Sequence, residues 1–233
     1  MNTALIRFAV VAAFALLGSP AMRAQTLNFL VDINTATLAA QDGANAPFYL
    51  DFDFNYGNSS LAGNTATLYD FALTGGGAVG SAVTNGSATG SIGSTVTLTA
   101  SAADPINELY QQFSAGTTDI QFRASITERG PDIGVPSEFS VSILDDSLGV
   151  PAQLFTTAPD TASLVTLDLN SANTIGNVDA YTSVSSADGN IAVTGVAASI
   201  RPVPEASATA ALLGGALASL AICARRLGLS ATA

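Results

Sequence analysis

Apolar and polar residues alternate with a period of two along most of the chain between residues 25 and 200. In the stretch TTDIQFRASIT, Ile120, Phe122, Ala124 and Ile126 share one side, and polar residues occupy the other. Because successive side chains of a strand point to opposite faces, this pattern predicts strands with one buried face. The same pattern recurs in TLNFLVDI, FYLDFDFNY, TATLYDFAL, STVTLTA, SEFSVSIL, SLVTLDL and NIAVTGVAASI.

Turn-forming residues separate these segments, with Gly, Asn, Asp and Pro clustered between them. Runs of strands with one polar face are typical of antiparallel sheets packed against each other. We therefore predict an all-β fold, an antiparallel, jelly-roll-like β-sandwich, in one domain over residues 25–200. Two segments depart from the pattern. Residues 105–113 (PINELYQQF) favour a short helix, and the glycine-rich residues 75–93 favour a flexible loop or a hairpin.

The first 24 residues have the organisation of a secretory signal peptide. Arg7 supplies a positive charge, residues 8–17 form an apolar run of ten, and Gly18, Ser19 and Pro20 end it. An apolar run of this length is too short to span a bilayer well. Residues 1–24 are therefore predicted to direct export and to be removed.

The other end of the chain carries a longer apolar segment. Residues 206–224 contain no charge, and a helix of this length would span about 28 Å, close to the thickness of the hydrocarbon layer. Arg225 and Arg226 follow at once, which favours a cytoplasmic C-terminus. We predict a transmembrane helix over residues 206–226, a short cytoplasmic tail over 227–233, and a proline-rich linker and sorting motif over 201–205. The alternative is a core helix rich in Gly and Ala.

This ending resembles the PEP-CTERM sorting signal of Gram-negative bacteria, which combines a short motif, an apolar helix and terminal arginines. Val203, Pro204, Glu205 and Ala206 spell V-P-E-A, where that family usually has V-P-E-P. The resemblance implies recognition by exosortase, an integral-membrane cysteine transpeptidase, with cleavage near the motif. It also implies an association with exopolysaccharide and biofilm.

The body is similar to a subgroup of the same proteins. Members open with an F-x-V-x-hydrophobic strand, matched here by Phe29, Val31 and Ile33, and continue with L-D-F-x-F, matched by residues 50–54. This resemblance implies no activity.

The charged residues of the chain exclude several classes of function. The net charge is -11, and the chain has no lysine, histidine or tryptophan. An acidic surface repels phosphate backbones, so we expect no nucleic-acid partner. Catalysis by His or Lys is excluded, and the single cysteine, Cys223, lies in the C-terminal apolar run. We therefore expect a protein that is not an enzyme and requires no cofactor.

Four residues are candidates for binding a cation. Asp51 and Asp53 lie two apart on the polar face of one predicted strand, where they are either solvated surface residues or ligands of a hydrated Ca²⁺. As glycosidase acids they would need a cleft. Asp168 and Asn170 open a segment that partly matches a calcium loop, although Ala172 occupies the fifth position and no distal Glu follows.

Together, these features predict an exported, non-enzymatic protein of the cell surface or extracellular matrix. Its expected partners are the membrane and, as the resemblance implies, an exosortase-type transpeptidase and exopolysaccharide. The alternative is a calcium-dependent carbohydrate-binding β-sandwich, which would expose aromatic side chains for stacking on sugars. The lack of tryptophan argues against that alternative.

Overall fold

The computed structural model describes residues 25–57, 64–100, 103–128, 137–156, 163–169, 175–180 and 183–203. The predicted signal peptide, Asn170, the motif from Pro204 onward, the helix over 206–226 and its two arginines lie outside the described residues. Within those seven ranges, no helix is both long and apolar enough to cross a membrane.

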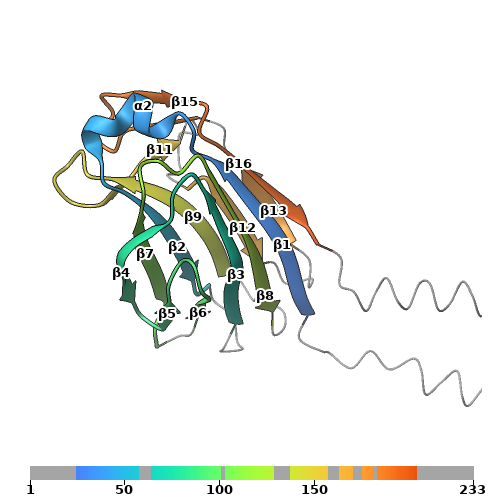
Figure 1. Ribbon diagram of the computed structural model, residues 1–233. Helices are drawn as coiled ribbons and strands as arrows, with labels where there is room; N and C mark the ends of the chain where they lie inside the picture. The colour runs from blue at the N-terminus through green and yellow to red at the C-terminus, as the bar shows by residue number, and fades with distance from the viewer. Residues whose placement is uncertain are drawn as a thin grey trace, which may run out of the picture.

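Two large antiparallel sheets pack face to face, which confirms the predicted all-β, sandwich-like fold (Figure 1). The first sheet has the order β16 (Ala197–Pro202), β1 (Gln25–Asn34), β8 (Asp119–Glu128), β3 (Asn64–Thr74), β6 (Val96–Ala100) and β5 (Ala88–Gly90). The second has the order β13 (Ile175–Ala180), β12 (Val165–Leu169), β9 (Ser137–Asp145), β2 (Phe48–Asn55), β7 (Ile106–Phe113) and β4 (Ala78–Asn85), and β10 (Ala152–Gln153) pairs with β9. The jelly-roll-like connectivity stays a prediction.

A small cap closes one end of the sandwich. It consists of α2 (Leu38–Asp42), η1 (Gly43–Asn45) and a three-stranded sheet of β11 (Phe155–Thr156), β14 (Ser183–Ser185) and β15 (Ala192–Thr194). Figure 1 shows α2 and β15 side by side at the top of the molecule. The Gln41 side chain joins them, because its amide donates to the Thr194 carbonyl oxygen (2.9 Å) and its oxygen accepts from the Thr194 N–H (2.8 Å).

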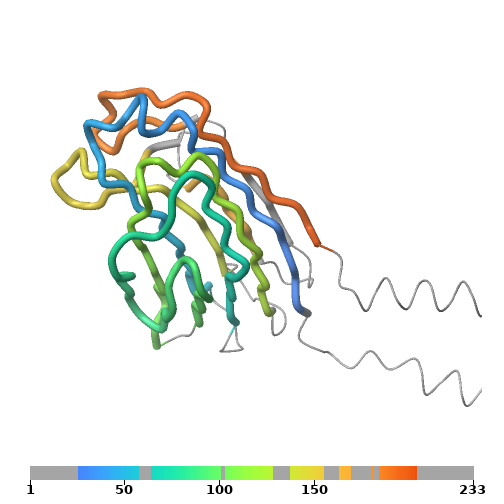
Figure 2. Tube along the Cα trace, viewed as in Figure 1, coloured from blue at the N-terminus to red at the C-terminus, as the bar shows by residue number. Residues whose placement is uncertain are grey.

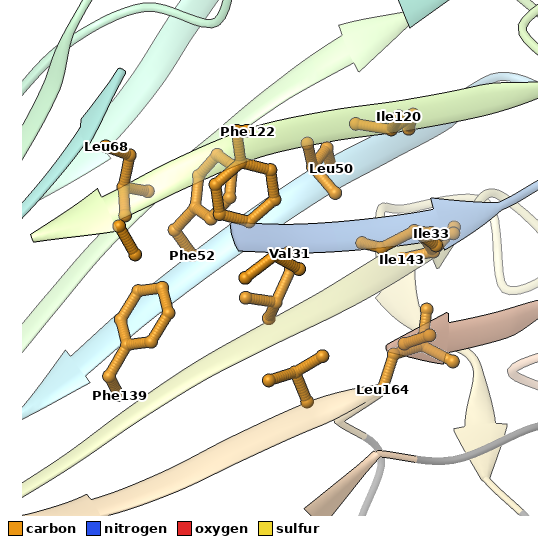
Figure 3. Packing of buried hydrophobic residues seen from close by; sticks show 14 of the residues in the cluster. Val31, Ile33, Leu50, Phe52, Leu68, Ile120, Phe122, Phe139, Ile143 and Leu164 are labelled. Atoms are coloured by element: carbon orange, nitrogen blue, oxygen red, sulfur yellow. The ribbon is translucent and has the colours of Figure 1, made fainter. Parts of the chain in front are cut away.

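The core lies between the two sheets and is built by the side chains that the alternation predicts to be buried. Phe122 on β8 meets Phe52 on β2 across the interface, with ring centroids 5.3 Å apart and planes at 83°. Edge-to-face contacts of this kind stabilise a core beyond the area that they bury. Figure 3 shows the packing of Val31, Ile33, Leu50, Phe52, Leu68, Ile120, Phe122, Phe139, Ile143 and Leu164.

A bulge in β3 changes which residues face the core. Asp70 adopts a positive φ of 55°, and the register of β3 against β8 shifts at this point. Asp tolerates this conformation better than most residues, and here its carboxylate lies 3.4 Å from Nε of Arg123. The bulge places Phe71 against Phe122, with ring centroids 5.4 Å apart.

The helix predicted over residues 105–113 is wrong, because this segment forms strand β7. The prediction failed because two of the inward-facing residues are polar. Gln111 accepts a hydrogen bond from the Ile92 N–H (2.9 Å) and donates to the Gly80 carbonyl oxygen (2.8 Å). Asn107 likewise accepts from the Ser87 N–H (2.7 Å). Their partners belong to the glycine-rich segment, whose backbone these side chains satisfy.

The glycine-rich residues 75–93 are neither a single loop nor a hairpin. They contain β4 and β5, which are edge strands of different sheets. The turn between them contains Gly86 at a φ of 63°, where an added Cβ would overlap the Ile106 carbonyl oxygen. Glycine therefore allows the chain to pass from one sheet to the other at this edge.

The chain enters and leaves the body at the same end of the sandwich. The first and last strands, β1 and β16, pair antiparallel, with Phe29 opposite Pro202. The Val203 N–H donates to the Asn28 carbonyl oxygen (2.7 Å), so pairing continues through Arg201 and Pro202, which the sequence assigned to a linker. Figure 2 shows the blue and orange-red ends side by side, opposite the cap.

Candidate functional site

The outer face of the second sheet gathers acidic side chains around β2. This strand lies between β7 and β9, and its residues Leu50, Phe52 and Phe54 point into the core. The residues between them point outward, so that Asp53 lies opposite Glu108 on β7. One carboxylate oxygen from each of Asp51, Asp53 and Glu108 lies within 4.8 Å of the other two. These three residues are called the outer triad below.

Asp51 is buried although it lies on the outer face. Only 1% of the residue is exposed, whereas Asp53 and Glu108 are half-buried. Asp51 Oδ2 accepts a long hydrogen bond of 3.4 Å from Nε2 of Gln153 on β10. Its Oδ1 has no hydrogen-bond partner among the residues that the structure describes. Asp51 is therefore not the solvated surface residue that the sequence suggested.

This environment disfavours ionisation of the triad. Burial, followed by the charges of Asp53 and Glu108, raises the pKa of Asp51 to about 8. Burial and the charge of Glu108 raise the pKa of Asp53 to about 6, although a hydrogen bond with Asp51 acts in the opposite direction. The two carboxyl groups thus share a proton near neutral pH.

The described part of the chain offers no cation to this site. The protein has no lysine and no histidine, and the arginines that the structure describes are Arg123 and Arg201. Both belong to strands of the other sheet, where Arg123 pairs with Asp70. Among the described residues no basic side chain neutralises the triad, which leaves protons or a bound ion for this role.

Two tyrosines lie next to the triad. Tyr110 on β7 is the cross-strand neighbour of Asp51, and Tyr49 precedes Asp51 by two residues on β2. Their ring centroids are 5.8 Å apart with planes at 85°. Burial, followed by the charge of Asp146, raises the pKa of Tyr49. Both tyrosines are half-buried, so this face carries partly exposed aromatic surface beside the carboxylates.

A second pair of acids is buried in the cap. Asp42 and Asp145 are both 0% exposed. Asp145 accepts hydrogen bonds from the backbone N–H and the hydroxyl of Ser147 and from the N–H of Ala187, at 2.7 to 3.0 Å. Burial raises the pKa of Asp42 to about 6 against the opposing hydrogen bond from Asn45, and the neighbouring Asp145 raises it further. Through its hydrogen bonds, Asp145 joins the loop after β9 to the turn before β15.

The remaining sequence candidates do not join the triad. Asp168 lies on β12 opposite Glu138 of β9. Burial of Glu138 raises the pKa of this residue, and the charge of Asp168 raises it further. Asn170 lies outside the described residues. The sequence interpretation missed Glu108, because residues 105–113 were expected to form a helix. The spacing of Glu108 and Tyr110 at alternate positions is the signal that would have placed both on one face of a strand.

Comparison with protein-family models, with curated proteins and with solved structures yields no match. The function is therefore inferred from the chain itself. The burial of Asp51 keeps a substrate from reaching its carboxyl group, which argues against a role in acid–base catalysis. The chemistry that the triad supports best is the binding of a small cation through oxygen atoms.

Proposed function

We propose that the protein is an exported, non-enzymatic component of the cell surface or extracellular matrix, held at a membrane or processed there through its C-terminal segment. The observation that carries this proposal is the pairing of β1 with β16. The body begins at Gln25, directly after the predicted signal peptide, and its pairing ends at Val203, directly before Pro204 and Glu205. Both connections therefore emerge at one end, as a tether to a membrane requires.

The spacing between the body and the apolar run supports the same role. Three residues, 203–205, separate the end of β16 from residue 206. Fully extended, they reach about 10 Å, so the body would stand close to the membrane surface with the cap pointing away from it. A short extended segment at this place suits recognition by an exosortase-type transpeptidase. Exopolysaccharide is the matching matrix partner that the sorting signal implies.

The test is expression of the full chain in a host that contains an exosortase. Replacing Arg225 and Arg226 by Glu removes the positive flank and is expected to lower the membrane-bound fraction, because the Ala- and Gly-rich run inserts only marginally. Replacing Pro204 and Glu205 by Ala is expected to leave anchoring intact and to abolish cleavage. Pro202→Ala, which changes a proline of β16 outside the motif, is the matched control.

Cell fractionation and the mass of the mature C-terminus give both readouts. Ala206→Pro, which restores the usual V-P-E-P motif, is expected to increase cleavage. Full anchoring of the arginine variant, together with unchanged processing in every motif variant, would reduce the tail to a plain anchor and overturn the sorting role.

A second candidate function is a calcium-dependent carbohydrate-binding module, with the tail as its anchor. The observation that favours it is the Tyr49–Tyr110 pair beside the outer triad, because tyrosine faces stack on sugar rings. Retention of the protein on exopolysaccharide in the presence of calcium, with loss in chelator and in Tyr110→Ala, would support it. Equal retention of Tyr110→Ala would rule this surface out.

A further inference from the structure

The outer triad combines three features that together indicate a ligand. Three carboxylate oxygens from two neighbouring strands converge within 4.8 Å. The deepest of the three residues, Asp51, is 1% exposed, and its Oδ1 has no hydrogen-bond partner in the described part of the chain. A buried acceptor without a partner is costly, and once Asp51 is ionised a bound cation is the partner that removes this cost together with the repulsion among the acids.

We propose that Asp51, Asp53 and Glu108 bind one hard divalent cation, preferentially Ca²⁺, on the outer face of the second sheet. This inference goes beyond the role at the membrane and does not depend on export or sorting.

The donor set selects the class of metal. Every ligand is a carboxylate oxygen, and the chain has no histidine and a single cysteine at position 223. Oxygen donors suit Ca²⁺ and Mg²⁺, whereas Zn²⁺ and Cu²⁺ favour nitrogen and sulfur. Calcium bonds of about 2.4 Å place oxygens on opposite sides of the ion about 4.8 Å apart, while the shorter bonds of magnesium limit this separation to about 4.2 Å. The three oxygens, which lie within 4.8 Å of one another, fall within the span that calcium coordination allows.

The surroundings provide an open side and further oxygens. Asp53 and Glu108 are half-buried, so an ion can reach the triad from solvent and retain water ligands. On β9, the neighbours of Asp53 and Asp51 are Ser140 and Ser142. Gln153 approaches Asp51 from β10, and rotation of its amide would turn the oxygen toward an ion.

The acidic pair in the cap, Asp42 and Asp145, lies in a different environment from the outer triad. Asp145 receives three hydrogen bonds from the protein itself, at 2.7 to 3.0 Å. Asp42 accepts another from the Asn45 amide (2.7 Å). Asp42 Oδ2, like Asp51 Oδ1, has no hydrogen-bond partner among the described residues. The cap differs from the triad because both of its acids are 0% exposed and no third carboxylate of the described residues converges with them. At the triad, the hydrogen bond from Gln153 to Asp51 is longer, at 3.4 Å.

Protons and the cation compete for the same oxygens. The titratable groups around Asp51 are Tyr49 and Asp53 on its own strand, Glu108 and Tyr110 on β7, and Glu138 farther along β9. Because a carboxylate binds the cation only when it is ionised, binding is expected to weaken as the pH is lowered.

The experiment uses the full chain in a mild detergent and Tb³⁺ as a luminescent substitute for calcium. The protein has no tryptophan, so energy transfer comes from tyrosine, and Tyr110 lies opposite Asp51. We expect a saturable Tb³⁺ signal at about pH 8, displaced by Ca²⁺ at lower concentrations than by Mg²⁺. Asp51→Asn and Asp53→Asn are expected to weaken Ca²⁺ binding at least about tenfold.

Asp168→Asn is the matched control, because it removes an acid from the same sheet but two strands away from β2. It is expected to leave the signal unchanged. Tyr110→Phe separates sensitisation from binding, since it is expected to reduce luminescence and to keep the rise in melting temperature that Ca²⁺ causes. A signal that decreases equally in the variants of Asp51, Asp53 and Asp168 would indicate general attraction to an acidic surface and overturn the site. Unchanged binding in Asp51→Asn, or stronger displacement by Mg²⁺, would also contradict the proposal.

Discussion

Without divalent cations, the protein is expected to lose stability as the pH rises from about 5 to about 8. The sign follows from Asp51, whose pKa in the folded protein, about 8, lies above the ordinary value of 3.8. Between these values the folded state holds a proton that the unfolded state has released. The stabilisation is complete below the unfolded pKa and disappears as the pH approaches 8. Asp53 and Asp42, with pKa values raised to about 6, act in the same direction.

The size of the effect is worked out for the proton that Asp51 shares with Asp53, because Asp51 is 1% exposed and solvent screens it little. Each pH unit between the two pKa values changes the free energy of unfolding by about 1.4 kcal/mol. The three units from about pH 5 to about pH 8 therefore correspond to about 4 kcal/mol. For a chain of this size, that corresponds to a decrease of about 10 °C in the melting temperature.

Asp51→Asn isolates this contribution, because the amide keeps the shape of the side chain and cannot ionise. In chelator at about pH 8, the variant is expected to be more stable than the wild type by about 2 kcal/mol, since the amide still requires hydrogen-bond partners. Its stability is expected to change much less with pH. Urea unfolding at constant ionic strength measures both effects, and Asp168→Asn is the control that should keep most of the dependence of the wild type, because its charge acts directly on Glu138 and not on Asp51. If wild-type stability rose with pH, or if Asp51→Asn kept the full dependence, the assignment of this burial cost to Asp51 would be wrong.

Two further predictions concern the fold. Gln111→Ala is expected to destabilise the protein by about 2 kcal/mol in urea unfolding, because it leaves the buried Ile92 N–H and the Gly80 carbonyl oxygen without their partner, whereas Gln112→Ala on the outward face should change it by less than about 0.5 kcal/mol. Equal effects would show that the inward glutamine does not support the glycine-rich segment. Residues 25–203 made alone are expected to give a soluble, β-rich monomer, and a far-UV spectrum dominated by helix or by disorder would contradict this.

The alternation of side chains was sufficient to predict most strands and the faces that they bury. Phe122 and its neighbours on β8 are buried as their spacing predicts, because burial of apolar area dominates where one face of a strand is uniformly apolar. The pattern failed at β7, where Asn107 and Gln111 face inward. Their role is to satisfy the backbone of a distant segment, and no local signal in residues 105–113 reveals that partner. The bulge at Asp70 was missed for a similar reason, since it depends on the pairing of β3 with β8.

The candidate site, like the fold, could be predicted from the sequence only in part. That Asp51 and Asp53 share one outward face follows from their spacing of two residues. That Glu108 joins them follows only from the register between β2 and β7, which sequence alternation does not determine. The burial of Asp51 could not be predicted from the sequence either, because it depends on the neighbours that the fold brings to the outer face. Gln153 is one of these neighbours. Local pattern thus predicts the face of a strand, and pairing decides which charges meet on it.

The cation site and the proposed export of the protein are physically connected through the shortage of basic residues. The arginines that the structure describes, Arg123 and Arg201, belong to the other sheet and do not neutralise the carboxylate cluster. Calcium sites of extracellular modules commonly have dissociation constants of about 10⁻⁴ to 10⁻³ M, weak enough to remain empty in the cytoplasm and to fill outside the cell. A triad of this kind would leave the chain less stable before export at neutral pH and would stabilise the sandwich once calcium is available. The same acids that cost stability inside the cell would then support the folded body at the proposed location outside it.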